Sequence, residues 1–198
     1  MVEAFKAHDT TAILTASANL GHYVADAHVP LHLLSNYDGQ LTKQQGIHAL
    51  WESRLPELFA YNYNCYAGKA RYIENPLTEA FKICRTSFSE ADSVLRLERS
   101  LNRSFPALKK YTMTVRGTRK VKDYSAAYSR SYQKLLRGMV QRRMRSAVLS
   151  VGSYWYSAWV DAGQPDLNKF IVKPLSAADR LKIKKEEMVF KKGKIPSF

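Results

Sequence analysis

Long apolar runs are missing from this sequence. No stretch of 18 apolar residues occurs, so the sequence offers no candidate for a membrane-spanning helix. The first residues also lack the charged, apolar and small-residue order of a signal peptide. The two cysteines, Cys65 and Cys84, form no CxxC or CxxH group. They could pair in an exported protein or could equally be free buried thiols.

Acidic residues are scarce relative to basic ones. The 198 residues include 31 lysines and arginines but 17 aspartates and glutamates, which gives a formal net charge of +14. Such an excess favours anionic partners, namely phosphate esters, nucleic acid or an acidic membrane surface. The charge predicts attraction to these partners and no particular reaction.

Alternating strand patterns and internal repeats are also scarce, so the sequence predicts an all-α fold. Apolar residues recur at three- and four-residue steps in four segments, about 2–29, 42–55, 87–101 and 125–159. Pro30 and Pro56 are expected to interrupt the first two helices. Thr42 with Gln45, and Ser87 with Glu90, have the spacing of capping boxes at helix starts. We expect a helical metal-binding domain over residues 1–172 and a weakly structured basic tail over 173–198.

Basic side chains gather in the last predicted helix and in the tail. A solvated helix face is the simpler interpretation of the first group, and a phosphate-binding track with stacking tyrosines is the alternative. The tail could solubilise the chain or hold anionic lipid or nucleic acid. The helix residues are Arg130, Lys134, Arg137, Arg142, Arg143 and Arg145, and the tail residues are Lys182, Lys184, Lys185, Lys191, Lys192 and Lys194.

The histidines are concentrated in one segment. Four of the five fall between Gly21 and Glu52, together with two acidic residues at helical spacing. A single His-x-x-x-acid step is usually a hydrogen-bonded or ionic pair on one helix face. Here the step occurs twice, with a further histidine just beyond Pro30, which favours a metal site. The candidate ligands are His22, Asp26, His32, His48 and Glu52.

Imidazole nitrogens and carboxylate oxygens are natural ligands of zinc. Three protein ligands from His32, His48 and Glu52 would leave a fourth position for water or substrate, as in catalytic zinc sites. His28 is expected to point away from His22 and Asp26, and His8 is expected at the surface.

The segment His22-Tyr23-Val24-Ala25-Asp26-Ala27-His28-Val29-Pro30-Leu31-His32 resembles the signature H-Y-x-small-D-x-x-x-P-x-H of bacterial zinc-dependent phospholipases C. The following His48-Ala49-Leu50-Trp51-Glu52 is similar to a His-x-x-Trp-acid step of fungal and plant single-strand-specific nucleases. These two groups form one helical superfamily with a three-zinc cluster. The resemblance extends over about residues 19–59.

The resemblance implies a role for each candidate ligand. His22 matches a ligand of the first zinc of a close pair, and Asp26 matches the carboxylate ligand of the third zinc. His32, His48 and Glu52 match the complete protein ligand set of the second zinc. The implied activity is phosphodiester hydrolysis by a two- or three-zinc hydroxide mechanism, with zinc-bound water as the nucleophile. The implied substrate is single-stranded nucleic acid or a phospholipid head group.

Other family features are not found in this chain. The family cluster needs a tryptophan, two histidines and an aspartate upstream of the first His-x-x-x-Asp step, and the 21 residues before His22 do not match that pattern. We therefore expect an N-terminally truncated member, possessing one complete zinc site and half-sites for two more, from a periplasmic or secreted parent protein. The alternatives are a non-catalytic zinc-bound helical protein and a basic nucleic-acid-binding module.

Overall fold

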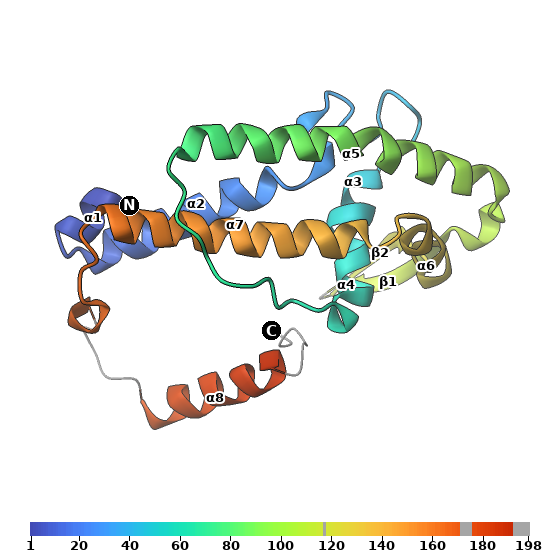
Figure 1. Cartoon of the computed structure of the whole chain (residues 1–198). Helices are drawn as coiled ribbons and strands as arrows, with labels where there is room; N and C mark the ends of the chain where they lie inside the picture. The colour runs from blue at the N-terminus through green and yellow to red at the C-terminus, as the bar shows by residue number, and fades with distance from the viewer. Residues whose placement is uncertain (117, 171–175, 192–198) are drawn as a thin grey trace. The chain divides into compact units, whose positions relative to one another are not determined.

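The structure, a computed structural model, describes residues 1–116, 118–170 and 176–191 (Figure 1). It is mostly helical, which confirms the mostly-α class. The described residues cluster into two compact units. Unit 1 comprises residues 1–28, 64–83 and 144–198, and unit 2 comprises residues 29–63 and 84–143. No helix among the described residues is long and apolar enough to cross a membrane.

Unit 1 begins with two helices, α1 (Val2–Lys6) and α2 (Thr10–Asp26), instead of one helix over about 2–29. Asp9 separates them, because its extended backbone and its carboxylate, which accepts from the Ala12 N–H at 2.9 Å, make it the N-cap of α2. A buried apolar cluster holds α2 against the other segments of this unit. Its buried members are Val24, Ile73, Ile83 and Tyr154.

The helix α5 (Pro76–Ser104) starts eleven residues earlier than the predicted helix at Ser87. Its start has better capping chemistry, since the Asn75 side chain accepts from the Thr78 N–H and Pro76 needs no hydrogen-bond partner at the first helical position. Ser87 is fully buried inside the helix, where it receives a hydrogen bond from Arg143. The predicted capping box at Ser87 and Glu90 is therefore wrong.

Two helices, α6 (Ala126–Leu135) and α7 (Met139–Asp161), replace the single helix predicted over about 125–159. Arg137 and Gly138 lie between them with φ values of +48° and +77°, a left-handed backbone that ends α6. The Ser125 hydroxyl caps α6 by accepting from the Tyr128 N–H at 3.2 Å. The start of this predicted segment is thus accurate, and its continuity is wrong.

A β-hairpin in unit 2 corrects the all-α prediction. Strands β1 (Tyr111–Arg116) and β2 (Arg119–Tyr124) pair antiparallel, with Tyr111 opposite Tyr124 and Met113 opposite Lys122. The alternation of threonine with larger residues in β1, and of basic with other residues in β2, is a strand pattern. β1 alternates apolar and polar residues over only six positions, and β2 does not continue that alternation, so the pattern is too short to stand out.

Short helical segments complete the chain. They are η1 (Pro30–Leu33), α3 (Ile47–Ala49), the π-helical turn η2 (Leu50–Arg54), α4 (Leu55–Phe59), η3 (Ala60–Asn62), η4 (Ala107–Lys109), η5 (Leu167–Phe170) and α8 (Ala177–Lys191). The helix α8 occupies most of the segment expected to be weakly structured. Residues 173–175 and 192–198 of that segment lie outside the described residues.

Candidate metal centre

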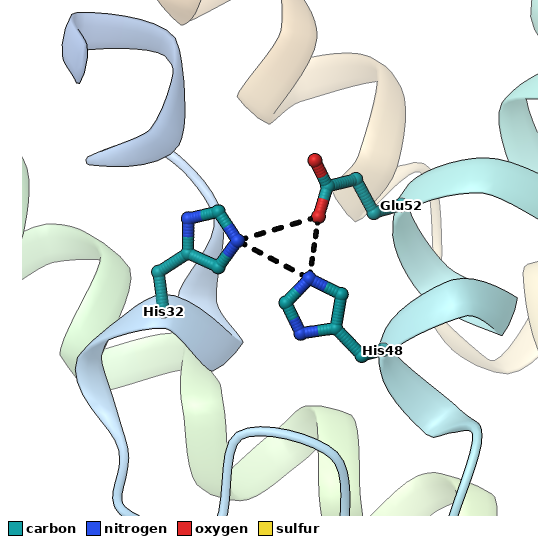
Figure 2. A group of neighbouring side chains, drawn as sticks. All are labelled: His32, His48 and Glu52. Atoms are coloured by element: carbon teal, nitrogen blue, oxygen red, sulfur yellow. Dashed lines mark hydrogen bonds and ion pairs between the residues drawn. The ribbon is translucent and has the colours of Figure 1, made fainter. Parts of the chain in front are cut away.

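His32, His48 and Glu52 lie together in unit 2, on two segments separated by a loop (Figure 2). His32 is on η1, which begins at Pro30 because proline suits the first position of a helical turn. His48 is on α3, and Glu52 is on the π-helical turn that follows it. The three side chains are part-buried.

The helix that carries His48 and Glu52 begins later than predicted. Gly46, with φ of +89°, precedes Ile47, so Thr42 and Gln45 lie in the loop and do not form a capping box. The helix also continues through Pro56 to Phe59. Proline lacks the N–H for the regular helical hydrogen bond, and the wide π turn lies directly before it. Glu52 is part of this widened turn.

The three ligand atoms face one another at distances suited to a small metal ion. His32 Nε2 lies 3.2 Å from His48 Nε2 and 3.4 Å from Glu52 Oε2, and His48 Nε2 lies 2.7 Å from Glu52 Oε2. Zinc–ligand distances of about 2.0–2.1 Å give a tetrahedron with edges of about 3.3–3.4 Å. Two of the three separations match these edges, and the third is shorter. The nitrogen and oxygen donors and their spacing therefore fit zinc.

The contact of His48 Nδ1 indicates which ring nitrogen carries the hydrogen. His48 Nδ1 lies 3.2 Å from the carbonyl oxygen of Tyr37, and a carbonyl can only accept. Nδ1 therefore carries the hydrogen, and in the neutral ring Nε2 presents its lone pair to the site. A lone pair and a carboxylate oxygen 2.7 Å apart repel each other unless a cation, either a proton or a metal ion, lies between them. The contact thus requires positive charge at this point.

Asp38 holds the loop against the start of the His48 helix. Its Oδ1 accepts from the backbone N–H of Gly46 at 3.0 Å and of His48 at 3.2 Å. Gly46 has no side chain with which to cap the helix, so Asp38 provides the cap from ten residues upstream of His48. Because Tyr37 and Asp38 are adjacent, the same turn fixes both the ring and the backbone of His48.

The loop is in turn anchored to α5 through Gln44. The Gln44 side chain is buried and donates to the Leu95 carbonyl at 2.8 Å and to Glu98 Oε2 at 2.5 Å. Glu98, fully buried, also accepts from the Tyr128 hydroxyl at 2.6 Å and from Lys110 at 3.1 Å. Burial and the Glu98 carboxylate raise the pKa of Tyr128, so its hydroxyl keeps the proton that it donates.

His22 and Asp26 lie on α2 in unit 1 and form an ion pair of their own, with His22 Nε2 3.3 Å from Asp26 Oδ2. The pair has the predicted spacing on one helix face. The only group of three or more potential ligands among the described residues is His32, His48 and Glu52. The roles of His22 and Asp26 as zinc ligands stay predictions.

The remaining histidines have other partners, both within unit 1. His28 is buried, with Nδ1 2.8 Å from the Val24 carbonyl and Nε2 3.2 Å from the Ser150 hydroxyl. His8 is exposed, and its ring stacks on Phe170 at a centroid distance of 5.1 Å. Neither Cys65 nor Cys84 is part of a disulfide, and burial raises the pKa of the Cys65 thiol.

One of the six basic helix residues does not fit a phosphate track. Arg143 is buried, contacts Ser87 and lies 3.6 Å from Glu90, while Arg142 lies 3.9 Å from the same carboxylate. Burial lowers the pKa of Arg143, and the neighbouring Glu90 opposes this shift. The buried Arg143 therefore fits neither a solvated face nor a phosphate track, while the Arg142 side chain is 58% exposed.

The sequence did not indicate the supporting residues. Asn36-Tyr37-Asp38-Gly39 is recognisable as a turn, and Gly39 adopts φ of +72° there. Aspartate is common in turns for local reasons, so nothing in the pattern shows that Asp38 caps a helix across the loop. Gln44 likewise gives no signal, because its partners are about 50 residues away.

We also compared the chain with models of protein families, with curated proteins and with solved structures. None of the three comparisons finds a match.

Proposed function

We propose that the chain binds zinc through His32, His48 and Glu52 and takes part in phosphodiester hydrolysis. The arrangement of three nitrogen and oxygen donors close to one another carries the proposal. The motif resembling zinc phospholipases C and single-strand nucleases contains these residues, and the net charge of +14 suits an anionic substrate. A helical bundle of that superfamily's type is part of the same proposal.

The residues in and around the site would have different roles in zinc binding. His32 and His48 supply neutral nitrogen donors, and Glu52 supplies a negative charge that partly offsets the charge of the ion. Asp38 and the Tyr37 carbonyl keep His48 in place, as outer partners of metal-bound histidines generally do. When bound, zinc supplies a Lewis acid for phosphoryl oxygens and lowers the pKa of its water towards neutrality.

His22 and Asp26 extend the proposal to further zinc ions. In the resemblance they contribute one ligand each to the other two sites, so we propose up to three zinc ions, with one complete protein ligand set in this chain. The proposed substrates are single-stranded nucleic acid and phospholipid head groups. A periplasmic or extracellular location also belongs to this proposal.

A second candidate is a zinc-binding protein without catalytic activity. It is favoured by the finding that the described residues contain a single group of three potential ligands. A phosphodiesterase of the proposed type uses neighbouring zinc ions about 3.5–4 Å apart, which a single three-ligand group cannot hold.

One experiment separates the two candidates. Purified protein is loaded with zinc, dialysed and analysed for metal content and for hydrolysis of bis(p-nitrophenyl) phosphate. We expect His32→Ala and Glu52→Gln to lose both bound zinc and hydrolysis, while His8→Ala keeps both. Zinc retained without hydrolysis supports the non-catalytic protein, and zinc binding unaffected by both substitutions would refute the site itself.

A further inference from the structure

The β-hairpin of unit 2 has an unusual concentration of positive charge. Its two strands contain four basic residues and one acidic residue, Asp123. The basic residues are Arg116, Arg119, Lys120 and Lys122. We call residues 111–116 and 118–124 the basic ribbon. Like charges in such number repel one another, so an anionic partner would relieve the repulsion as well as bind.

One face of the basic ribbon combines these charges with exposed apolar groups. Lys122 lies opposite Met113, and Lys120 lies opposite Val115. Because residues two apart on a strand share a face, all four side chains are on one side of the ribbon. Met113 is 62% exposed and Val115 is 69% exposed. This face is therefore apolar and cationic, with no carboxylate from either strand.

Tyr111 adds an aromatic ring to this face. It is 37% exposed, and the Lys122 ammonium lies 4.2 Å from its ring centroid. Aromatic rings beside cations are the elements that single-stranded nucleic-acid sites combine, because bases stack on the rings and phosphates pair with the cations.

The base of the basic ribbon is fixed to the segment that carries the proposed zinc ligands (Figure 1). Arg54, which shares the π-helical turn with Glu52, donates to the Tyr124 carbonyl at 3.1 Å and lies 3.6 Å from Asp123. Arg54 is buried, so these contacts are shielded from water. The Tyr124 hydroxyl also donates to the Gln45 carbonyl at 3.3 Å, three residues before His48. A partner on the ribbon would therefore be held by the same unit as the metal centre.

We propose that the basic ribbon is a binding surface for single-stranded nucleic acid. Its cations are arranged along an extended element, and Lys120 and Lys122 are spaced by about 6.8 Å along the strand, which suits a linear chain of phosphates. The Lys122 ammonium beside the Tyr111 ring favours nucleic acid over an anionic membrane, because bases stack on aromatic rings, and vesicle binding is one arm of the test. The proposal deepens the proposed function by naming a surface that would bind one of its substrates, and the binding itself needs no metal.

The test measures binding of a fluorescein-labelled 20-nucleotide oligothymidylate by anisotropy, in EDTA so that zinc-dependent cleavage cannot contribute. The variant Lys120→Glu/Lys122→Glu is compared with Lys69→Glu/Arg85→Glu, which changes the net charge equally at exposed positions. We expect the ribbon variant to bind roughly tenfold more weakly and the control to bind within about twofold of wild type. The milder Lys120→Gln/Lys122→Gln should lower the slope of log K against log salt by about 1.4.

Circular dichroism melting of each variant shows that it is folded. Equal weakening by the ribbon and control variants would overturn the proposal, because total charge and not the ribbon would then govern binding. No oligonucleotide binding by the wild type would also overturn it. The proposal would fail too if the ribbon substitutions abolished binding to vesicles with anionic lipid but left oligonucleotide binding unchanged. None of these outcomes depends on zinc or on hydrolysis.

Discussion

The same His-x-x-x-acid step occurs in each unit of the molecule, with different surroundings. On α2, His22 and Asp26 lie 3.3 Å apart, and the His22 side chain is 67% exposed. In unit 2, His48 and Glu52 lie 2.7 Å apart, and the His48 side chain is 25% exposed. The second pair also has His32 beside it and a loop that fixes the histidine ring. Helical spacing thus produces a pair, while a third donor and outer contacts produce a candidate metal centre.

Removing the third donor, His32, should cause the largest loss of zinc affinity. We expect His32→Ala to weaken zinc binding roughly 100-fold or more, because a ligand contributes more than the outer partners that typically account for 10- to 100-fold. His22→Ala should change the affinity of this site by less than about threefold, since the described residues place His22 with a single acidic partner. Isothermal titration calorimetry with zinc measures both. Equal losses of zinc affinity in the two variants would show that His22 and His32 belong to one site.

Removing the cap of the His48 helix should have the next largest effect. Asp38→Ala leaves two backbone N–H groups without their acceptor and frees the turn that binds the His48 ring. We expect zinc affinity to fall by about 10- to 100-fold. Asp9→Ala is the matched control, because Asp9 caps α2 in the other unit. That substitution should lower stability by about 1 kcal/mol and leave zinc affinity unchanged. A similar loss of affinity in both variants would contradict a specific role for Asp38.

Disconnecting the loop from α5 should have a smaller effect. Gln44→Leu removes the hydrogen bond to the Leu95 carbonyl and one of the hydrogen bonds to the buried Glu98 carboxylate. We expect the free energy of unfolding to fall by about 1–3 kcal/mol, since a buried acceptor is left unsatisfied. Urea unfolding monitored by circular dichroism provides the value. If stability is unchanged, the loop is held by its other contacts.

The pair on α2 should matter least to stability. Asp26→Asn weakens the contact with His22, whose side chain is 67% exposed, and we expect the free energy of unfolding in urea to fall by less than about 1 kcal/mol. Glu52→Gln in the other unit is the comparison, because it removes the charge beside both His32 and His48. A larger loss of stability for Asp26→Asn than for Glu52→Gln would contradict the expectation that the unit 2 contacts contribute more to stability.

The sequence predicted local features better than long-range ones. Helical periodicity within residues 87–101 predicts a core stripe of Phe88, Ala91, Val94, Leu95 and Leu101. Ala91, Val94 and Leu101 are buried, and Leu95 is half-buried. Phe88, predicted for the same stripe, is 59% exposed. His32, His48 and Glu52 lie together, as their spacing and the resemblance predict, and their role as metal ligands stays a prediction.

Other features could not be predicted, because they depend on distant residues. The cap of α3 comes from Asp38 across a loop, and the support of that loop comes from Glu98 on α5. The hairpin is not predicted because the apolar–polar alternation of β1 spans only six residues and β2 does not continue it. The breaks at Asp9 and Gly138 depend on single residues within long apolar patterns. The domain boundary at residue 172 stays a prediction.

The loop between His32 and His48 gives metal binding a consequence for the unfolded chain. An ion held by both residues would close residues 33–47 into a ring of the kind that a disulfide forms. The entropy removed from the denatured chain by closing 15 residues is worth about 3 kcal/mol in the chain-entropy account of cross-links. Neither cysteine is part of a disulfide, so such a reversible cross-link would depend on the supply of metal and not on oxidation.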